Sequence, residues 1–302
     1  MRIFVTGLSG FIGSHTARVL LEAGCEVLGL VRPGSDLWRL RGFETRLEIV
    51  YGDLSHPETY QPAVDAWQPQ ACIHLAWYAK PGEYLHSNEN LRSLQDSIDL
   101  MLFLAKTGCK TIVMAGTCAE YEMQSSMLNE DSKLKPSTLY AACKLAISLI
   151  GSQLAEASNI NFSWARFFYV YGPYEDKRRL VPAAINSFLE GKPFLSTPGE
   201  QVRDYLHVED LARAMWRMAE VNANDTFNVS SGVPLTVATL LQKIAELTAK
   251  AELLRLGELS YRDWEPMYIC GDNSRLLSLG WKPRFSLEDG LRQTIGFWKS
   301  NT

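Results

Sequence analysis

The features that mark several common classes of protein are missing from this sequence. Basic residues show no excess, because 30 lysines and arginines face 34 aspartates and glutamates, which argues against nucleic-acid and membrane-surface binding. No run approaches the roughly twenty apolar residues that cross a bilayer. The six cysteines lack CxxC or other metal-ligand spacing, so we expect buried free thiols in a reducing compartment and no metal site. The chain begins with the strand-like segment 1–7 rather than a charged and apolar leader, so we expect a cytoplasmic protein.

What the sequence does contain is a regular alternation of strand-like and helix-like segments. This order predicts right-handed βαβ units and an α/β fold with a doubly wound, Rossmann-like parallel sheet. From residue 171 onward, prolines and glycines punctuate shorter elements. We therefore predict a dinucleotide-binding domain over 1–170, to which later segments return, and a smaller mixed α/β domain over 171–302 that is mainly substrate-binding. The expected strands are 3–5, 26–31, 47–51, 71–75, 111–114 and 162–168, and the expected helices include 13–23, 88–106 and 138–158.

A glycine-rich turn, TGLSGFIG, joins the first strand to the first helix. Gly7, Gly10 and Gly13 let the backbone approach a pyrophosphate, and the helix N-terminus offers free N–H groups. The spacing differs from the GxGxxG form, and an ordinary βα turn is the alternative. The strand before it and the βαβ units behind it favour a dinucleotide site. Phe11 and Ile12, inside the turn, are assigned to the same cofactor.

The residues expected at the adenosine end indicate which dinucleotide binds. The second strand ends in LVRP, with no carboxylate for the adenosine ribose, and Arg32 suits a 2′-phosphate. NADP(H) is therefore favoured over NAD(H), although a solvated loop in which Arg32, Arg39 and Arg41 bind nothing specific is the alternative. Asp53 ends the third strand, where it either caps a turn or binds the adenine amino group. Further cofactor contacts are assigned to Leu54, Leu75 and Ala76.

The segment STLYAACK places Tyr140 and Lys144 four residues apart on one face of a helix. A phenol has a reference pKa of about 10, so it exchanges protons readily near neutral pH only when a cation stabilises its phenolate. Lys144 can supply that cation, and Thr117, after a central strand, can orient a substrate oxygen. A tyrosine and a lysine that merely extend from a helix surface are the alternative for YxxxK alone. Together the three residues predict an acid–base site.

The chain resembles the extended short-chain dehydrogenase/reductase family, in its branch of nucleotide-sugar epimerases, dehydratases and ketoreductases. Three features carry the resemblance together: TGxxGFIG, a threonine after a central strand, and YxxxK. The resemblance implies an NAD(P)-dependent enzyme that acts on a nucleotide-diphosphate sugar, of the kind found in deoxysugar biosynthesis. It also implies a homodimer formed through the helices near 88–106 and 138–158. Further segments that carry it are HLAW at 74–77, NEN at 88–90, RFFYVYGP at 166–173, RDYLHVED at 203–210 and SLGWKPRFSLEDGL at 278–291.

The resemblance implies a role for each residue of the acid–base site. Tyr140 is the acid/base, Lys144 holds the nicotinamide ribose and lowers the tyrosine pKa, and Thr117 orients the sugar oxygen.

It also implies residues that bind substrate. Arg203 and Arg262 match two arginines that contact the nucleotide diphosphate, whose charge suits forked guanidinium donors. For Arg203 considered alone, an ion pair with Asp204 or Asp210 is as good an interpretation as contact with the diphosphate. The motif around it favours the diphosphate. Tyr169 stands where many family members place an asparagine that touches the diphosphate.

The residues after the catalytic threonine narrow the reaction. Dehydratases of this family continue with an Asp-Glu pair, whereas this chain has Cys118 and Ala119, so no elimination of water is expected. Glu120 is predicted to point to the opposite side, because side chains alternate along a strand. Cys118 is expected to be a small buried thiol, with acid–base catalysis of an epimerisation as the alternative. His74 and His207 are expected to be structural.

The favoured activity is NADP(H)-dependent reduction of a nucleotide-linked 4-ketosugar. Hydride passes from the nicotinamide to the sugar C4, and Tyr140 supplies the proton. The first alternative is a nucleotide-sugar 4-epimerase with tightly bound NAD, which uses the same residues twice. Arg32 decides between them, because a basic residue favours a dissociable NADPH. The remote alternative is a non-catalytic, cofactor-binding regulatory protein.

Overall fold

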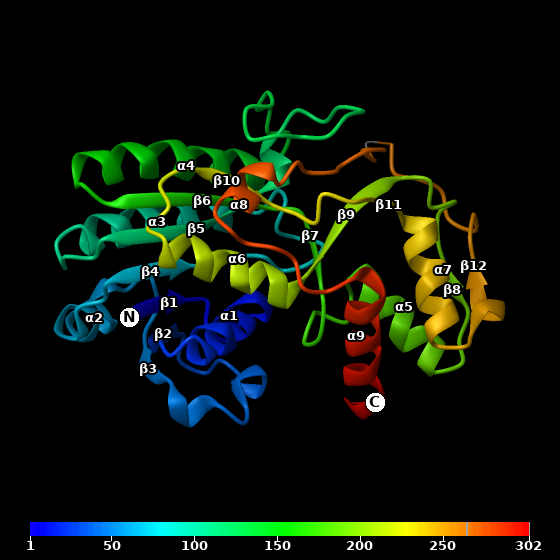
Figure 1. The fold of residues 1–302 in the computed structure, drawn as a ribbon, viewed down its shortest axis with the longest axis horizontal. Coiled ribbons are helices and arrows are strands. Elements are labelled where there is room, and N and C mark those ends of the chain that lie inside the picture. The colour runs from blue at the N-terminus through cyan, green and yellow to red at the C-terminus, as the bar shows by residue number, and fades with distance from the viewer. Residues whose placement is uncertain (264, 302) are drawn as a thin grey trace.

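The computed structural model describes residues 1–263 and 265–301. Its main sheet has seven strands in the order β10-β6-β5-β4-β1-β2-β3, and every neighbouring pair is parallel (Figure 1). The predicted Rossmann-like α/β fold is confirmed, and the edge strand β10 comes from late in the chain. The strands are β1 (Arg2–Thr6), β2 (Glu26–Val31), β3 (Glu48–Tyr51), β4 (Ala71–His74), β5 (Thr111–Thr117), β6 (Asn161–Phe167) and β10 (Thr226–Val229).

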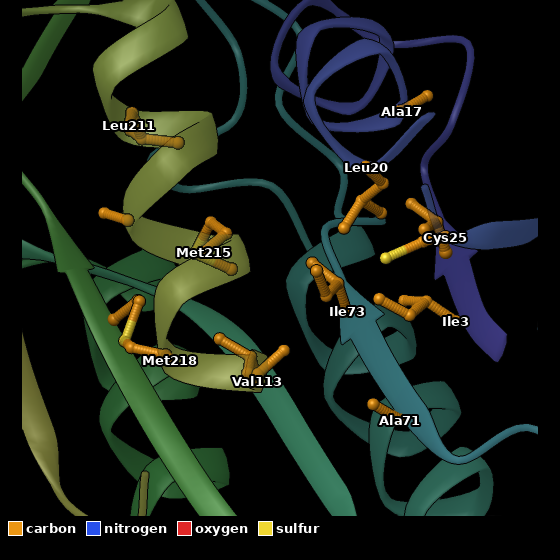
Figure 2. Packing of buried hydrophobic residues seen from close by; sticks show 14 of the residues in the cluster. Ile3, Ala17, Leu20, Cys25, Ala71, Ile73, Val113, Leu211, Met215 and Met218 are labelled. Carbon is orange, nitrogen blue, oxygen red and sulfur yellow. The ribbon is translucent and has the colours of Figure 1, made fainter. Parts of the chain in front are cut away.

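Helices cover both faces of this sheet. Side chains alternate along β1, so Ile3 and Val5 join one core and Phe4 joins the other. In the first core, Leu20 of α1 and Met215 of α6 pack over the strands (Figure 2). Burial on both faces explains why the strands read as nearly continuous apolar runs. The helices around the sheet are α1 (Phe11–Glu22), α2 (Gln61–Trp67), α3 (Glu89–Leu104), α4 (Leu139–Ala157) and α6 (Val208–Glu220).

A smaller group of elements lies beside the main sheet, to the right in Figure 1. A three-stranded sheet, in the order β11-β9-β7, and a two-stranded sheet of β12 and β8 belong to it. Phe188, Leu240 and Trp298 share a separate apolar core there. The predicted boundary at residue 170 stays a prediction. The elements are β7 (Tyr169–Tyr171), α5 (Leu180–Leu189), β8 (Phe194–Leu195), β9 (Val202–His207), β11 (Pro234–Thr236), α7 (Val237–Leu247), β12 (Leu254–Arg255) and α9 (Leu287–Asn301).

The predicted strands and helices agree with these elements except at their ends. β5 continues beyond the predicted end at 114, because Gly116 and Thr117 still pair with Arg166 and Phe167 of β6. This extension places Thr117 at the last position of a central strand. The short helices are α8 (Ser274–Ser278) and the 3₁₀ turns Trp38–Leu40, Glu44–Arg46, Pro57–Thr59, Cys118–Glu120 and Ala251–Leu253.

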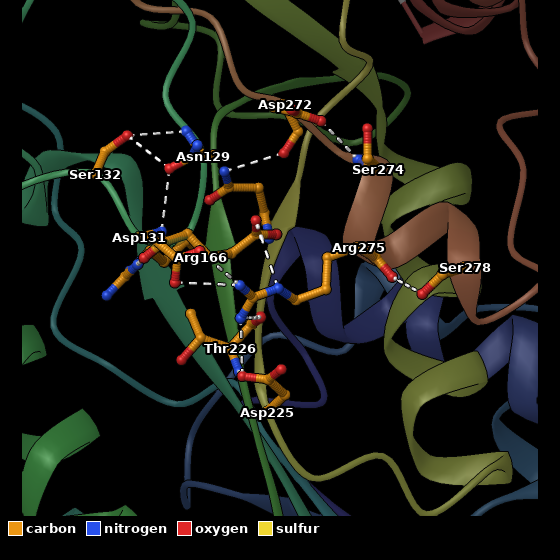
Figure 3. A network of polar contacts seen from close by, with 12 residues as sticks. Asn129, Asp131, Ser132, Arg166, Asp225, Thr226, Asp272, Ser274, Arg275 and Ser278 are labelled. Carbon is orange, nitrogen blue, oxygen red and sulfur yellow. Dashed lines mark hydrogen bonds and ion pairs between the residues drawn. The ribbon is translucent and has the colours of Figure 1, made fainter.

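Charged side chains fix the loop that follows β5. Arg275 of α8 forms ion pairs with Asp131 at 3.1 Å and with Asp225 at 3.0 Å (Figure 3). Arg166 of β6 donates to the carbonyl oxygen of Glu130 at 3.1 Å. These contacts tie the loop to β6, β10 and α8, so the segment between β5 and α4 is anchored at its middle.

Two sequence expectations concern thiols and membranes. All six cysteines are buried and free, as expected. Within residues 1–263 and 265–301, no helix combines the length and the apolar character that a membrane crossing requires.

Candidate active site

A cavity of about 2140 Å³ lies at the ends of β1, β2, β4 and β5 and continues to β7 and β9. Open α/β sheets bind their ligands at such strand ends. The cavity brings together every site residue that the sequence predicted, although their individual roles stay predictions. These residues are Gly7, Gly10, Phe11, Ile12, Gly13, Arg32, Asp53, Leu54, Leu75, Ala76, Thr117, Tyr140, Lys144, Tyr169, Arg203 and Arg262.

The glycine turn forms one end of the cavity. Gly7 has a φ of +71°, and a Cβ there would lie 2.8 Å from the backbone nitrogen of Ala76. A Cβ on Gly13 would lie 2.1 Å from the carbonyl oxygen of Gly7, so helix α1 can approach β1 this closely only with glycine. Gly10 is the N-cap of α1, and no side chain caps the helix. The N–H groups of the first turn are therefore left for a ligand, which fits the diphosphate of a dinucleotide.

At the adenosine end of the cavity, the three arginines of the predicted loop differ in exposure and in their contacts. Arg32 is exposed and lines the cavity, and Arg41 is exposed without lining it. Arg39 has a structural role, because its Nε donates to the carbonyl oxygen of Tyr174 at 3.0 Å. Asp53 caps a turn, since its Oδ1 accepts from the backbone N–H of Ser55 at 3.1 Å and from the Ser55 hydroxyl at 2.9 Å. Arg32 and Arg39 both line the cavity, and Arg32 is the better placed to meet a phosphate, because it has no side-chain hydrogen bond among the described residues.

Tyr140 lies in the first turn of α4, deep in the cavity wall. Burial raises the pKa of its phenol above the ordinary value, the Tyr84 phenol adds to this, and a hydrogen bond with Thr117 opposes it. The Tyr84 ring meets the Tyr140 ring edge to face at 4.9 Å. The net shift of the Tyr140 pKa in the protein by itself is thus upward, with desolvation as its largest cause, and the lowering of this pKa by Lys144 stays a prediction.

Lys144 is buried and directed toward β5 and β4. Its Nζ donates to the carbonyl oxygen of Ala115 at 2.7 Å and lies 3.7 Å from the centre of the Trp77 ring. Burial lowers the pKa of Lys144 to about 7, and the charge of Glu120 opposes this shift. The ammonium group is thus poised between its charged and neutral forms near neutral pH.

The segment after Thr117 turns its carboxylate away from the cavity. Glu120 is fully buried, pairs with Arg166 at 2.8 Å and accepts from the backbone N–H of Thr117 at 2.8 Å. The predicted direction of Glu120 is correct, but a 3₁₀ capping turn rather than strand alternation produces it. Burial raises the pKa of the Cys118 thiol to about 12, which fits the predicted inert thiol better than an acid/base.

The far end of the cavity carries the predicted diphosphate arginines. Arg203 of β9 is buried and pairs with Glu265, so neither Asp204 nor Asp210 is its partner. Its guanidinium also lies 5.4 Å from the centre of the Tyr169 ring. Arg262 lines the same end.

Two of the five histidines, His74 and His207, were predicted to be structural. His74 Nδ1 lies 2.7 Å from the Thr6 hydroxyl and Nε2 lies 2.9 Å from the Ser97 hydroxyl. Burial lowers the pKa of His74 and of His207 to about 3, so both are neutral. Across the part of the chain that the structure describes, no group of His, Cys, Asp and Glu could hold a metal ion.

The cavity residues that were not assigned from the sequence include Trp77, Tyr84, Glu175 and Arg179. Glu175 is buried, its Oε2 has no hydrogen-bond partner among the described residues, and burial raises its pKa to about 8. The Arg179 guanidinium lies 5.5 Å from the centre of the Tyr84 ring, beside Tyr140. The tryptophan in HLAW and the arginine pair before α5 were visible in the sequence, but no local pattern directs them to Tyr140.

A parallel sheet with a glycine turn at one strand end and a Tyr–Lys pair beside a strand threonine defines an enzyme of the extended short-chain dehydrogenase/reductase class. The model of the NAD dependent epimerase/dehydratase family matches residues 3–230. The chain belongs to this family, as its resemblance to nucleotide-sugar enzymes implied, and the non-catalytic alternative is set aside.

Three relatives illustrate the similarity. The UDP-glucuronate 4-epimerase of Thermodesulfobacterium geofontis is 26% identical, over 98% of this chain and 96% of that protein. The solved structure of UDP-glucose 4-epimerase from Thermotoga maritima with UDP-glucose matches with a TM-score of 0.89 and 25% identity, over 100% of this chain and 99% of that chain. MoeE5, solved with UDP-glucose and NAD, matches with a TM-score of 0.84 and 26% identity, over 100% and 99% of the two chains.

Proposed function

We propose that this protein is an NAD-dependent 4-epimerase of a nucleotide-linked sugar. The observation that carries the proposal is the surroundings of Tyr140: it lines the cavity together with Thr117 and Lys144, whereas Glu120, the carboxylate that follows Thr117, is withdrawn into an ion pair with Arg166. Oxidation and re-reduction at one carbon need one proton-transfer group, but elimination of water needs a further acid and base. The arrangement therefore supports chemistry at C4 without dehydration.

The epimerase replaces the ketoreductase that the sequence favoured. That preference rested on Arg32 alone. The relatives described above include two 4-epimerases, and a third is a structure that holds NAD. Their identities, near 25%, support the type of reaction better than they support any particular sugar.

The residues around Tyr140 have distinct tasks in this proposal. A bound nicotinamide supplies the acceptor, and then the donor, of the C4 hydride. Tyr140 takes the proton of the sugar 4-hydroxyl and returns it after the keto sugar has turned its other face. Thr117 holds the phenol through the hydrogen bond between their hydroxyls. Lys144, in its charged form, stabilises the phenolate and holds the cofactor ribose.

Arg203 and Arg262 bind the diphosphate in this proposal. A forked guanidinium suits two phosphate groups, and Arg203 is already oriented by its contact with the Tyr169 ring. Glu265 competes for the same guanidinium, so substrate must displace that ion pair. The diphosphate then anchors the nucleotide while the sugar stays free to rotate.

The direct test is conversion of a panel of UDP-, dTDP- and CDP-linked hexoses and uronates, followed by NMR of the sugar anomeric and C4 protons. Formation of a 4-epimer by the wild-type protein, and none by Y140F, supports the proposal. Failure to convert any member, together with oxidation of NADPH by a 4-keto sugar, contradicts it.

A 4-ketoreductase that uses NADP(H) is the second candidate, because Arg32 is exposed at the adenosine wall of the cavity. Calorimetric titration with NADPH and NADH measures this directly. If Arg32 binds a 2′-phosphate, R32A weakens NADPH binding by about tenfold or more and leaves NADH unchanged, as expected for a lost charge-assisted hydrogen bond. The matched control is R41A, which removes an exposed arginine outside the cavity.

We also propose a cytoplasmic homodimer formed through α3 and α4. These helices expose apolar side chains on their surfaces. Exposed apolar surface of this kind is typical of a protein–protein interface. The exposed residues are Leu91, Leu102, Leu149 and Ile150. Light scattering of the wild type should give twice the chain mass, and L149E should lower it. L195E, at an exposed leucine of β8, is the control.

A further inference from the structure

Trp77 contacts both members of the Tyr–Lys pair, although no role has been assigned to it. Its ring centre lies 3.7 Å from Lys144 Nζ and 6.4 Å from the centre of the Tyr140 ring, which it meets nearly edge on. No carboxylate of the described residues lies within ion-pair distance of Lys144. Besides the carbonyl oxygen of Ala115, at 2.7 Å, the indole face is the near group that favours the charged form of the lysine, because the face of an aromatic ring attracts a cation.

A chain of hydrogen bonds fixes the orientation of the Trp77 ring. The indole N–H donates to Asn90 Oδ1 at 2.8 Å, and Asn90 Nδ2 donates to the carbonyl oxygens of Tyr84 at 2.6 Å and Ser87 at 2.8 Å. Asn90 is fully buried at the start of α3. The loop between β4 and α3 is thereby held on one side by the indole.

The same loop also holds Tyr140 directly. The backbone N–H of Tyr140 donates to the carbonyl oxygen of Leu85 at 3.0 Å, and the Tyr84 ring lies against the phenol. The loop that follows β4 therefore contacts both members of the Tyr–Lys pair, through Trp77 and through its contacts to Tyr140.

We propose that Trp77 is a positioning residue that holds Lys144 as a cation beside Tyr140. The inference rests on the proposed acid–base role of Tyr140 and goes beyond it by assigning a group that favours the charged form of the lysine. If Trp77 acts in this way, its aromatic face is required to keep Lys144 charged, whereas loss of the hydrogen bond from its N–H to Asn90 has a smaller effect. A tryptophan with a purely structural role would show no such difference.

The ionisable groups around Lys144 determine how this shows in a pH profile. Burial lowers the pKa of His74 of β4 to about 3, raises that of the Glu120 carboxyl after β5 against the opposing charge of Arg166, and raises that of the Tyr140 phenol. Burial lowers the pKa of Lys144 to about 7, so its charge changes near neutral pH. Loss of the cation–π contact disfavours the ammonium form, so the lysine should lose its proton at a lower pH.

The experiment compares W77F, which keeps an aromatic face, with W77L, which does not. W67L is the matched control, because Trp67 also donates its indole N–H, to Glu48, and lies on α2 outside the cavity. Two quantities are measured: the pH dependence of kcat, and the pH dependence of Lys144 labelling by acetic anhydride, followed by peptide mass spectrometry. Labelling requires no substrate, so it stands even if the proposed reaction fails.

We expect W77L to shift the labelling midpoint of Lys144 down by about one pH unit, a tenfold change in the proton equilibrium. The alkaline limb of kcat should shift equally, with the KM for nucleotide sugar changed less than twofold. W77F should restore most of both values, and W67L should leave both at wild-type values. An unchanged labelling midpoint in folded W77L, or equal effects of W77F and W77L, would overturn the proposal.

Discussion

The two ends of the cavity are built in different ways. The glycine turn of the cofactor end is local in sequence: Gly7 and Gly10 lie between β1 and α1, Gly13 lies in the first turn of α1, and Gly13 packs against Gly7 itself. The substrate end is assembled from segments far apart in the chain, where Arg203 of β9 meets Tyr169 of β7 and Glu265 of a later loop. Spacing along a sequence can therefore identify the first end, but contacts between distant segments determine the second.

The chemistry between these two ends should be the most sensitive part. Y140F removes the acid/base hydroxyl, and positioned proton transfer contributes about 10²–10⁴-fold to a rate. We expect kcat to fall by that amount while the affinity for the nicotinamide cofactor changes less than twofold. Progress curves and calorimetry measure the two quantities, with Y51F, at an exposed tyrosine, as the control. Full activity of Y140F would remove Tyr140 from the mechanism.

The local end should fail by sterics. A Cβ on Gly13 would lie 2.1 Å from the carbonyl oxygen of Gly7, so G13A must push α1 away from β1. Overpacking of this kind costs about 1–3 kcal/mol of stability. We expect a lower melting temperature and loss of cofactor binding in calorimetry. G296A in α9, where a Cβ meets nothing within 4 Å, should leave cofactor binding unchanged and should not lower the melting temperature, because alanine favours a helix over glycine.

At the substrate end of the cavity, we expect loss of a charged side chain to weaken substrate binding. R203A removes a buried guanidinium from the predicted diphosphate site. A hydrogen bond to a charged group is worth about 1.5–3 kcal/mol, which corresponds to roughly 10- to 150-fold in KM. The KM for the nucleotide sugar should rise by this factor, with a smaller change in kcat and no change in cofactor affinity. R292A, which removes an exposed arginine paired with Glu288 on α9, is the control. A cofactor affinity that falls with R203A would show that the two ends are not separate.

Glu175 should give the smallest effect, visible as a pH dependence of stability. Burial raises its pKa from the ordinary value of 4.5 to about 8, so the folded state disfavours ionisation that the unfolded chain permits. Wild-type stability should therefore decline as pH rises from about 4.5 to about 8. E175Q should abolish this decline and melt at least about 2–4 °C above the wild type at pH 9, but not at pH 4. E58Q, at an exposed glutamate, should follow the wild type at both pH values.

The sequence was sufficient for the fold, and it named a set of residues that the structure brings to one cavity. Alternating apolar segments predicted the parallel sheet, and YxxxK placed Tyr140 and Lys144 together because helix geometry is periodic. The sequence did not predict the pKa values of these two side chains. Desolvation raises the Tyr140 pKa and lowers that of Lys144, and neither shift can be obtained from spacing.

Partners from distant segments were also beyond the sequence. From the sequence, Asp204 and Asp210 were the expected alternatives for an ion pair with Arg203, because they are near in the chain. In the structure Arg203 pairs with Glu265, which lies in a later loop. Trp77 meets Lys144 because the chain from β4 to α3 passes over the start of α4. Such contacts depend on how elements pack, and only the three-dimensional arrangement supplies that information.

The most direct test of the central claim is to follow a nucleotide sugar with deuterium at C4 through a reaction without added cofactor. Once the panel has identified a substrate, mass spectrometry and NMR report where the label goes. The account predicts a 4-epimer that keeps deuterium at C4, because the hydride returns to the carbon it left within one active site. A product that loses the label, or that forms only when NADPH is added and consumed, would contradict it.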